Sequence, residues 1–267
     1  MLRGSIQALE THEMSAPLEY AIETSGLTRR FGAFTAVDGV SLKIPKGHLY
    51  GFLGLNGAGK TTTIRMLTTL LPPSQGTARL WGHDVTRDPL AVRTLVGLVS
   101  DETSESHSTW TAREYLGYFA RVRHLADPPA TVEKILDDVG LDPAFRGRLI
   151  GTYSTGMKRR VEIARALMGR PKVLFLDEPT RGLDLPAKRE MWNLLRRLAM
   201  EEQVTTFLSS HDAQEVRSLC SEISVVSAGR VVYTGSTRDL GADLDTFEDR
   251  LVELLTQEGL KISSKTR

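Results

Sequence analysis

GLNGAGKT, at residues 54–61, is the stretch that decides the fold. It matches the phosphate-binding loop pattern, in which a glycine and four further residues precede Gly-Lys-Thr. The short apolar run at residues 49–53 predicts a β-strand, and residues 60–70 predict a helix that stops at the Pro72-Pro73 pair. We therefore predict a strand–loop–helix unit. The alternative is an ordinary glycine-rich turn with an exposed lysine.

The glycines of this loop explain how it can bind phosphate. They reach backbone conformations that other residues avoid, so successive N–H groups can curl around a polyphosphate while the helix N-terminus adds positive partial charge. We expect Lys60 to neutralise β- and γ-phosphate oxygens and Thr61 to hold a Mg²⁺ ion. The residues expected to contact nucleotide here are Gly54, Leu55, Asn56, Gly57, Ala58, Gly59, Lys60, Thr61 and Thr62.

A second motif lies at the end of a continuous apolar strand, residues 173–176. Asp177 and Glu178 follow at once, which puts two carboxylates at the C-terminal edge where α/β sheets bind ligands. Asp177 suits a Mg²⁺ contact, and Glu178 suits the base that polarises an attacking water, which implies hydrolysis. A charged strand end without a catalytic role is the simpler alternative.

Composition excludes several classes of protein. The 267 residues are 40% hydrophobic and 25% charged, as in globular domains, and the net charge of +1 gives no bulk attraction to nucleic acid. The single cysteine cannot form an internal disulfide. The sequence contains no run of about 18 apolar residues, so no membrane-spanning helix is predicted, and no secretory signal is evident. Residues 1–18 are predicted to be a flexible leader, in which Met14 is an alternative start.

Strand and helix patterns alternate around the two motifs. Residues 20–24 and 40–44 alternate apolar and polar side chains, which predicts a small antiparallel element. Residues 101–153 predict an inserted helical subdomain, and residues 204–208 a second buried strand. The fold class is therefore predicted as α/β, with helices on both faces of a sheet. Further predicted elements are helices at residues 111–126, 130–139, 159–168 and 247–255 and a hairpin at residues 225–233.

Together the motifs resemble the nucleotide-binding subunit of ATP-binding cassette (ABC) transporters. Downstream come Ser-Thr-Gly-Met at 154–157, Leu-Asp-Glu-Pro-Thr at 176–180, Gly-Leu-Asp at 182–184 and Ser-His-Asp at 210–212. A short cassette without a fused membrane segment is most like the ATPase of two-component (ABC-2 type) exporters of drugs, polysaccharides or lipids. The resemblance implies a P-loop NTPase (RecA-like) core with an antiparallel β subdomain and an inserted α-helical subdomain, over residues 19–235. Residues 236–267 would form a helical tail.

The resemblance also implies roles that the residues alone leave open. Phe31 would stack on adenine; otherwise it is a core or strand-end phenylalanine. His211 would contact the γ-phosphate and the catalytic water, and Asp184 would lie in a loop that contacts a partner subunit. Ser154 and Gly156 would contact ATP bound by the phosphate loop of a second copy. Two copies would then enclose two ATP molecules, and neither would complete a site alone.

Three positions depart from the common family pattern. Leu55 stands where a proline is frequent, and Thr155 replaces the first glycine of a Ser-Gly-Gly signature. Asp101 falls where the family usually has a glutamine that reaches Mg²⁺. A carboxylate can also ligate Mg²⁺, but its charge would repel phosphate. The basic clusters at residues 158–160 and 196–197 are predicted to be solvated helix faces.

The predicted function is ATP binding and hydrolysis that energise a separate membrane permease for export, at the inner face of the cell membrane. The expected partners are a second copy and the permease, which would touch residues 101–110; no nucleic acid is expected. One alternative is a soluble ABC ATPase in assembly or repair. Another is a P-loop kinase or GTPase. A GTPase would need an Asn-Lys-x-Asp motif, which is absent from the sequence, and a kinase would not explain Ser154 or Glu178.

Overall fold

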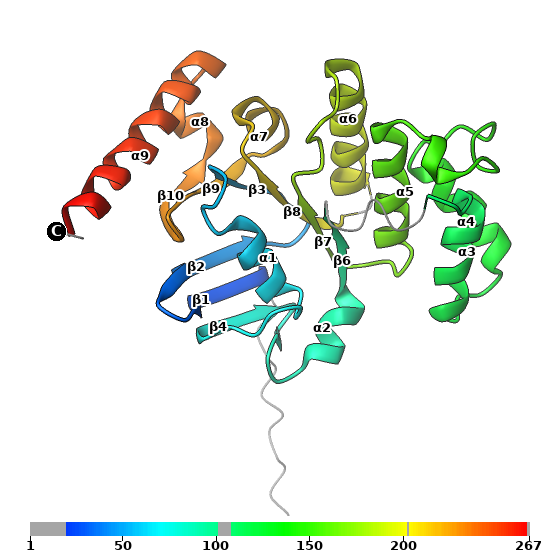
Figure 1. Cartoon of the computed structure of the whole chain (residues 1–267), viewed down its shortest axis with the longest axis horizontal. Coiled ribbons are helices and arrows are strands. Elements are labelled where there is room, and N and C mark those ends of the chain that lie inside the picture. The colour runs from blue at the N-terminus through cyan, green and yellow to red at the C-terminus, as the bar shows by residue number, and fades with distance from the viewer. Residues whose placement is uncertain (1–19, 101–107, 202, 266–267) are drawn as a thin grey trace, which may run out of the picture.

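Two β-sheets and the helices that cover them make up the fold (Figure 1). The computed structural model describes residues 20–100, 108–201 and 203–265. The predicted leader and the predicted Mg²⁺ contact Asp101 lie outside the described residues. Over the described residues, no helix combines the length and the apolar character needed to cross a membrane.

The strands form an antiparallel sheet near the N-terminus and a larger, mostly parallel sheet. In chain order they are β1 (Tyr20–Phe31), β2 (Phe34–Pro45), β3 (Leu49–Gly54), β4 (Gln75–Leu80), β5 (His83–Asp84), β6 (Val96–Val99), β7 (Val173–Asp177), β8 (Thr205–Ser210), β9 (Glu222–Ser227) and β10 (Arg230–Ser236). The helices are α1 (Lys60–Leu67), α2 (Pro89–Leu95), α3 (Ala112–Val122), α4 (Pro128–Asp138), α5 (Thr155–Leu167), α6 (Leu185–Glu201), α7 (Ala213–Leu219), α8 (Thr237–Leu240) and α9 (Leu244–Lys265).

The larger sheet brings the sequence motifs to one edge. Its strand order is β10-β9-β3-β8-β7-β6, and β3, β8, β7 and β6 pair in parallel. Because β3, β7 and β8 end at Gly54, Asp177 and Ser210, the phosphate loop, the two carboxylates and the Ser-His-Asp motif leave the sheet side by side. β10 pairs antiparallel with β9, which confirms the predicted hairpin. The antiparallel pairing of β1 with β2 confirms the small antiparallel element predicted for residues 20–24 and 40–44.

Strand β7 lies between β8 and β6 in the larger sheet, and all of its residues are buried. Leu174 and Leu176 belong to the core that α3, α4, α5, α6, α7 and α9 share. Val173 and Phe175 belong to the core on the other face, which β1, β2, β4, α1 and α2 share. Helices therefore cover both faces of the parallel sheet, as the fold class requires, and the antiparallel sheet covers part of one.

Two predicted helices end earlier than expected. α1 stops at Leu67 rather than at residue 70, because Thr69 takes a left-handed conformation with φ 62°. α3 stops at Val122 rather than at residue 126, and His124 has φ 52°. A residue in the left-handed conformation cannot continue a right-handed helix, so the chain changes direction at Thr69 and again at His124.

Helix α5 begins earlier than expected, at Thr155 rather than at residue 159. Ser154 is the N-cap of the helix: its hydroxyl accepts a hydrogen bond from the Met157 N–H at 3.2 Å. This bond satisfies a backbone donor in the first turn, which otherwise lacks an intrahelical partner.

The prediction that the two basic clusters form solvated faces is wrong for Arg159 and Arg160, whereas Arg197 is exposed as predicted. Arg159 is buried. Arg160 donates to the Val139 carbonyl at 2.6 Å, and Arg197 donates to the Asp138 carbonyl. The clusters on α5 and α6 therefore fasten both helices to the C-terminal end of α4, where carbonyl groups lack intrahelical partners.

Candidate functional site

The phosphate loop is wedged between two other parts of the chain. A Cβ atom at Gly54 would lie 2.5 Å from the Val226 carbonyl oxygen, and one at Gly59 would lie 2.5 Å from the Ala36 carbonyl oxygen. Gly59 also has φ 101°, which L side chains rarely adopt. The Gly229 N–H donates to the Ala58 carbonyl at 3.0 Å. Strand β2 and the β9–β10 turn thus fix the shape of the loop.

Lys60 opens helix α1 and turns back over the loop. Its side chain is only 6% exposed, and Nζ donates to the Gly54 carbonyl at 2.7 Å. Nζ also lies 3.1 Å from Glu178 Oε1. The ammonium group therefore lies between the loop that would hold phosphate and the second of the two motif carboxylates.

Asp177 is held at the end of β7 by two hydroxyl groups. Thr61 Oγ1 donates to Oδ2 at 2.6 Å, and Ser209 Oγ donates to Oδ1. Ser209 lies opposite Asp177 in the parallel register of β7 and β8. Sequence reasoning missed Ser209; the signal was a polar residue directly after the apolar strand at 204–208. Residues from two other segments thus converge on this carboxylate.

Glu178 and His211 face each other beside this cluster. His211 Nδ1 lies 2.6 Å from Glu178 Oε2. Glu178 has φ 52°, an unusual conformation for a residue with a side chain, and its N–H donates to the Ser209 carbonyl at 3.1 Å. Strained backbone of this kind persists only where surrounding contacts enforce it. A cleft of about 280 Å³ opens here, lined in part by Thr61, Asp177 and Glu178.

The predicted signature residues form a separate group. Ser154 caps α5, and the nearest neighbours of a Cβ at Gly156 would be Ala187 and Leu183, at 3.7 and 3.9 Å. Asp184 Oδ1 accepts a hydrogen bond from the Ala187 N–H at 2.9 Å. These residues therefore meet at the start of α6, whereas the contacts of the phosphate loop are with β2, β7 and the β9–β10 turn.

Phe31 lies at a third place, the end of β1, where it pairs with Phe34 across a tight turn. The residue is 46% exposed, and the Arg29 guanidinium lies 4.7 Å from the ring centre. Phe31 is therefore a strand-end residue with an accessible ring rather than a core residue.

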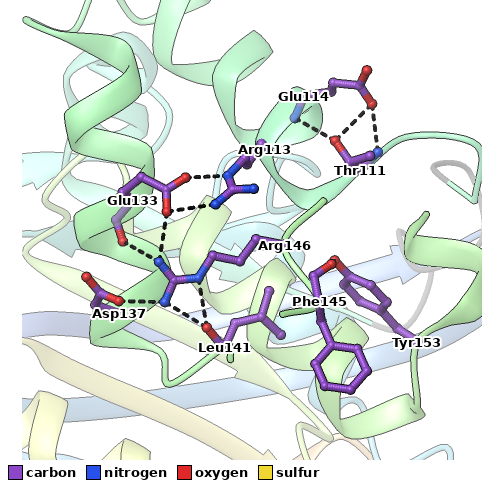
Figure 2. Close-up of polar contacts among 9 residues, drawn as sticks. All are labelled: Thr111, Arg113, Glu114, Glu133, Asp137, Leu141, Phe145, Arg146 and Tyr153. Atoms are coloured by element: carbon purple, nitrogen blue, oxygen red, sulfur yellow. Dashed lines mark hydrogen bonds and ion pairs between the residues drawn. The ribbon is translucent and has the colours of Figure 1, made fainter. Parts of the chain in front are cut away.

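A polar network supports the segment that leads into the signature (Figure 2). Arg146 is 4% exposed and donates to the Leu141 carbonyl, to Glu133 Oε2 at 2.9 Å and to Asp137. Arg113 on α3 contacts the same Glu133 carboxylate. Figure 2 shows the Arg146 guanidinium between the two acidic side chains of α4 and the 141 carbonyl. The network joins α3, α4 and the chain that continues to α5.

Replacing Arg146 with methionine tests this network. Methionine keeps the aliphatic packing but removes the donors, so we expect the free energy of unfolding to fall by about 2 to 3 kcal/mol. Arg113→Met is the matched control, because its pair with Glu133 is half exposed and should contribute less than about 1 kcal/mol. Chemical denaturation measures both, and equal losses would contradict the central place of Arg146.

A parallel sheet that carries a phosphate loop and two carboxylates at one edge is the architecture of P-loop NTPases, and this chain is an ATPase of that class. Within the class, it belongs to the ABC transporter family, whose model matches residues 37–181, more than half of the chain. The resemblance in the motifs is thereby confirmed.

Relatives and solved structures agree with this placement. The daunorubicin/doxorubicin resistance ATP-binding protein DrrA of Streptomyces peucetius is 42% identical over 233 residues, which cover 86% of this chain and 70% of the relative. The bacitracin transport ATP-binding protein BcrA of Bacillus licheniformis is 37% identical, over 79% of this chain and 68% of the relative. CbiO1 of Clostridium perfringens, part of the ABC transporter complex cbiONQ, has a similar fold, with 26% identity and a TM-score of 0.78 over 92% of this chain and 99% of that one.

Proposed function

We propose that this chain binds Mg²⁺-ATP between two copies of itself and that hydrolysis energises a separate membrane permease for export. The observation that carries the proposal is the convergence of Lys60, Asp177 and Glu178 beside the phosphate loop. The names of DrrA and BcrA, which refer to drug resistance and to bacitracin transport, support export as the direction.

ATP would lie along the phosphate loop, with loop N–H groups and Lys60 on the β- and γ-phosphates. The residues present fit a Mg²⁺ ion, because the Thr61 hydroxyl and the Asp177 carboxylate are adjacent oxygen donors and Mg²⁺ is held by few protein oxygens plus phosphates and water. Bound there, the ion would neutralise charge on the phosphates. A contact between Asp101, which lies outside the described residues, and this Mg²⁺ ion is likewise part of the proposal.

Glu178 is proposed as the base that takes the proton of the attacking water, and His211 as the group that holds that water and the γ-phosphate. The 2.6 Å contact between the two side chains supports a shared task, because each restricts the orientation of the other. Ser209 and Thr61 fix the neighbouring Asp177, so the base lies next to a rigid carboxylate.

The proposed second copy would contribute Ser154, Gly156 and Asp184. Within one chain these residues gather at the start of α6, apart from the phosphate loop. Ser154 starts a helix of 13 residues, and such an N-terminus favours an anion through its partial positive charge. Two copies arranged head to tail would bring this helix start against the ATP held by the other copy.

Phe31→Ala tests the proposed adenine contact. Loss of stacking should weaken ATP binding by roughly 1 to 3 kcal/mol, the usual range for an aromatic side chain on a nucleobase. Phe34→Ala is a matched control, since Phe34 lies across the same turn and is 64% exposed. Titration of both variants with a fluorescent ATP analogue gives the affinities, and an unchanged affinity for Phe31→Ala would assign the ring to another role.

The proposed association with a permease is tested by isolating the tagged chain from native membranes in mild detergent. The proteins that co-purify with it are then identified. We expect one polytopic membrane protein in fixed proportion, which would place the chain at the inner face of the membrane. A soluble assembly or repair ATPase would instead yield only soluble partners. The contact proposed for residues 101–110 predicts that substitutions at Trp110, which is 38% exposed, release the permease without changing basal ATP hydrolysis.

A further inference from the structure

One buried carboxylate outside the motifs connects two of them to helix α6. Glu215 lies on α7 and is 1% exposed. Its Oε1 accepts hydrogen bonds from Thr180 Oγ1 at 2.7 Å and from Trp192 Nε1 at 3.3 Å, and its Oε2 accepts one from Ser210 Oγ at 2.6 Å. Burial raises the pKa of this carboxyl above its ordinary value, against the lowering effect of the Ser210 and Thr180 bonds.

Two of these donors flank the proposed catalytic pair. Thr180 follows Glu178 by two residues, and Ser210 directly precedes His211. One carboxylate therefore holds the chain beside each member of the pair, whose own side chains are 2.6 Å apart.

The loop that carries His211 is closed by further bonds to the same helix start. Ser210 Oγ accepts from the Asp212 N–H at 3.0 Å, and Asp212 Oδ1 accepts from the Glu215 N–H at 3.0 Å. Because the Ser210 hydroxyl accepts a hydrogen bond from the Asp212 N–H and donates one to Glu215, its hydrogen has a single orientation. The loop has little freedom as long as the carboxylate is present.

The third donor extends the connection to α6. Trp192 lies on that helix, and Lys188, one turn earlier, pairs with Asp212 at 2.6 Å. Helix α6 follows the 182–184 segment that is proposed to meet the second copy. Glu215 thus contacts the segments next to the proposed base and the histidine, and also the helix that follows the proposed dimer contact.

We propose that Glu215 is a positioning residue, which sets the relative placement of Glu178 and His211 for ATP hydrolysis. It acts through Thr180 and Ser210 rather than by touching nucleotide. The proposal rests on the roles given above to Glu178 and His211. Its physical basis is that the left-handed backbone at Glu178 needs external restraint, and that a shift of about 1 Å in reacting groups can cost roughly 100-fold in rate.

The first test compares Glu215→Ala with Glu215→Gln. Alanine removes both acceptors, so kcat should fall by about 20-fold or more while KM for ATP changes by less than about threefold, since Lys60 and Thr61 do not contact Glu215. Glutamine keeps an oxygen for Thr180 and Trp192, and its amide can donate to Ser210. We expect it to restore kcat to within about threefold of wild type.

Stability is separated from positioning by a matched variant. Tyr50→Phe removes another buried hydrogen bond, between the Tyr50 and Ser224 hydroxyl groups at 2.7 Å, in the larger sheet and away from the proposed catalytic pair. It should lower the melting temperature and leave kcat per folded molecule unchanged. If Glu215→Ala behaves in the same way, with kcat per folded molecule at the wild-type value, the proposal is overturned.

A double-mutant cycle gives the second test. Ser210→Ala alone should lower kcat by about 5- to 10-fold, and it should add nothing in the Glu215→Ala background, because the connection is already broken there. Effects that multiply would overturn the proposal. If Glu215→Ala does not fold, Ser210→Ala decides by itself, since a wild-type kcat would overturn the connection to His211.

The reference variants Glu178→Gln and His211→Ala separate the proposed catalytic roles of this pair from the proposed positioning role of Glu215. If both hydrolyse ATP at the wild-type rate, the proposed function of the pair fails. If both are slow while Glu215→Ala is as fast as wild type, only the positioning role fails.

Discussion

Lys60→Ala is expected to abolish measurable ATP hydrolysis and to weaken ATP binding by roughly 2 to 5 kcal/mol, the cost of removing one partner of a buried charge pair. The side chain is 6% exposed and lies close to both the phosphate loop and Glu178, so its removal takes the positive charge from the loop and the ion pair from Glu178. Isothermal titration with ATP and a phosphate-release assay measure the two quantities.

Lys134→Ala is the control for Lys60→Ala. Lys134 is also a lysine that pairs with a carboxylate, Asp138, but its side chain is 72% exposed and belongs to α4. It should leave binding and turnover unchanged. Hydrolysis at the wild-type rate by Lys60→Ala would refute the assignment of the phosphate loop.

Glu178→Gln is expected to lower kcat by about 100-fold or more, since glutamine keeps the shape of the side chain but cannot accept the proton of the attacking water. ATP binding should remain, because Lys60 and the loop are unchanged. The variant should therefore accumulate an ATP-bound dimer, which light scattering coupled to size-exclusion chromatography detects.

The matched control is Glu190→Gln on α6, whose carboxylate pairs with Arg160 and is 68% exposed. It should turn over ATP normally and show no added dimer. A Glu178→Gln protein that binds ATP and stays monomeric would contradict the arrangement in which two copies enclose the nucleotide.

The local sequence pattern was sufficient to predict those elements that combine an unbroken apolar run with a clear boundary residue. The strand–loop–helix unit at residues 49–67 and the strand ending at Asp177 combine apolar runs with glycine or carboxylate boundaries, so the sequence predicts them with nearly their observed limits. The pattern also predicted that the Asp-Glu pair lies at the C-terminal edge of a sheet, where the structure places the phosphate loop too.

Elements stabilised mainly by distant partners escaped prediction. β4 buries only Ala78 and Leu80, so its sequence has no continuous apolar pattern. The strand is stabilised by its antiparallel backbone pairing with β1. Leu70 continued the apolar period of α1, yet it is 62% exposed, because the chain turns at Thr69. The basic clusters were misread since a sequence cannot distinguish an arginine that faces water from one that donates to the end of another helix, as Arg160 does.

Site residues were predictable only where a motif contains them. Ser209 on β8 and Glu215 on α7 contact the segments of the proposed catalytic residues by side-chain hydrogen bonds, with partners up to 35 residues away in the sequence. Such contacts depend on the register of β7 against β8 and on the packing of α7, which no local pattern specifies.

The hydrogen bond from Gly229 to Ala58 has a consequence for biosynthesis. The phosphate loop is translated before the β9–β10 turn that completes its surroundings. A nascent chain on the ribosome, however long the loop itself has been exposed, should acquire affinity for nucleotide only when that turn has emerged. Truncated products would then be unable to compete for the cell's ATP.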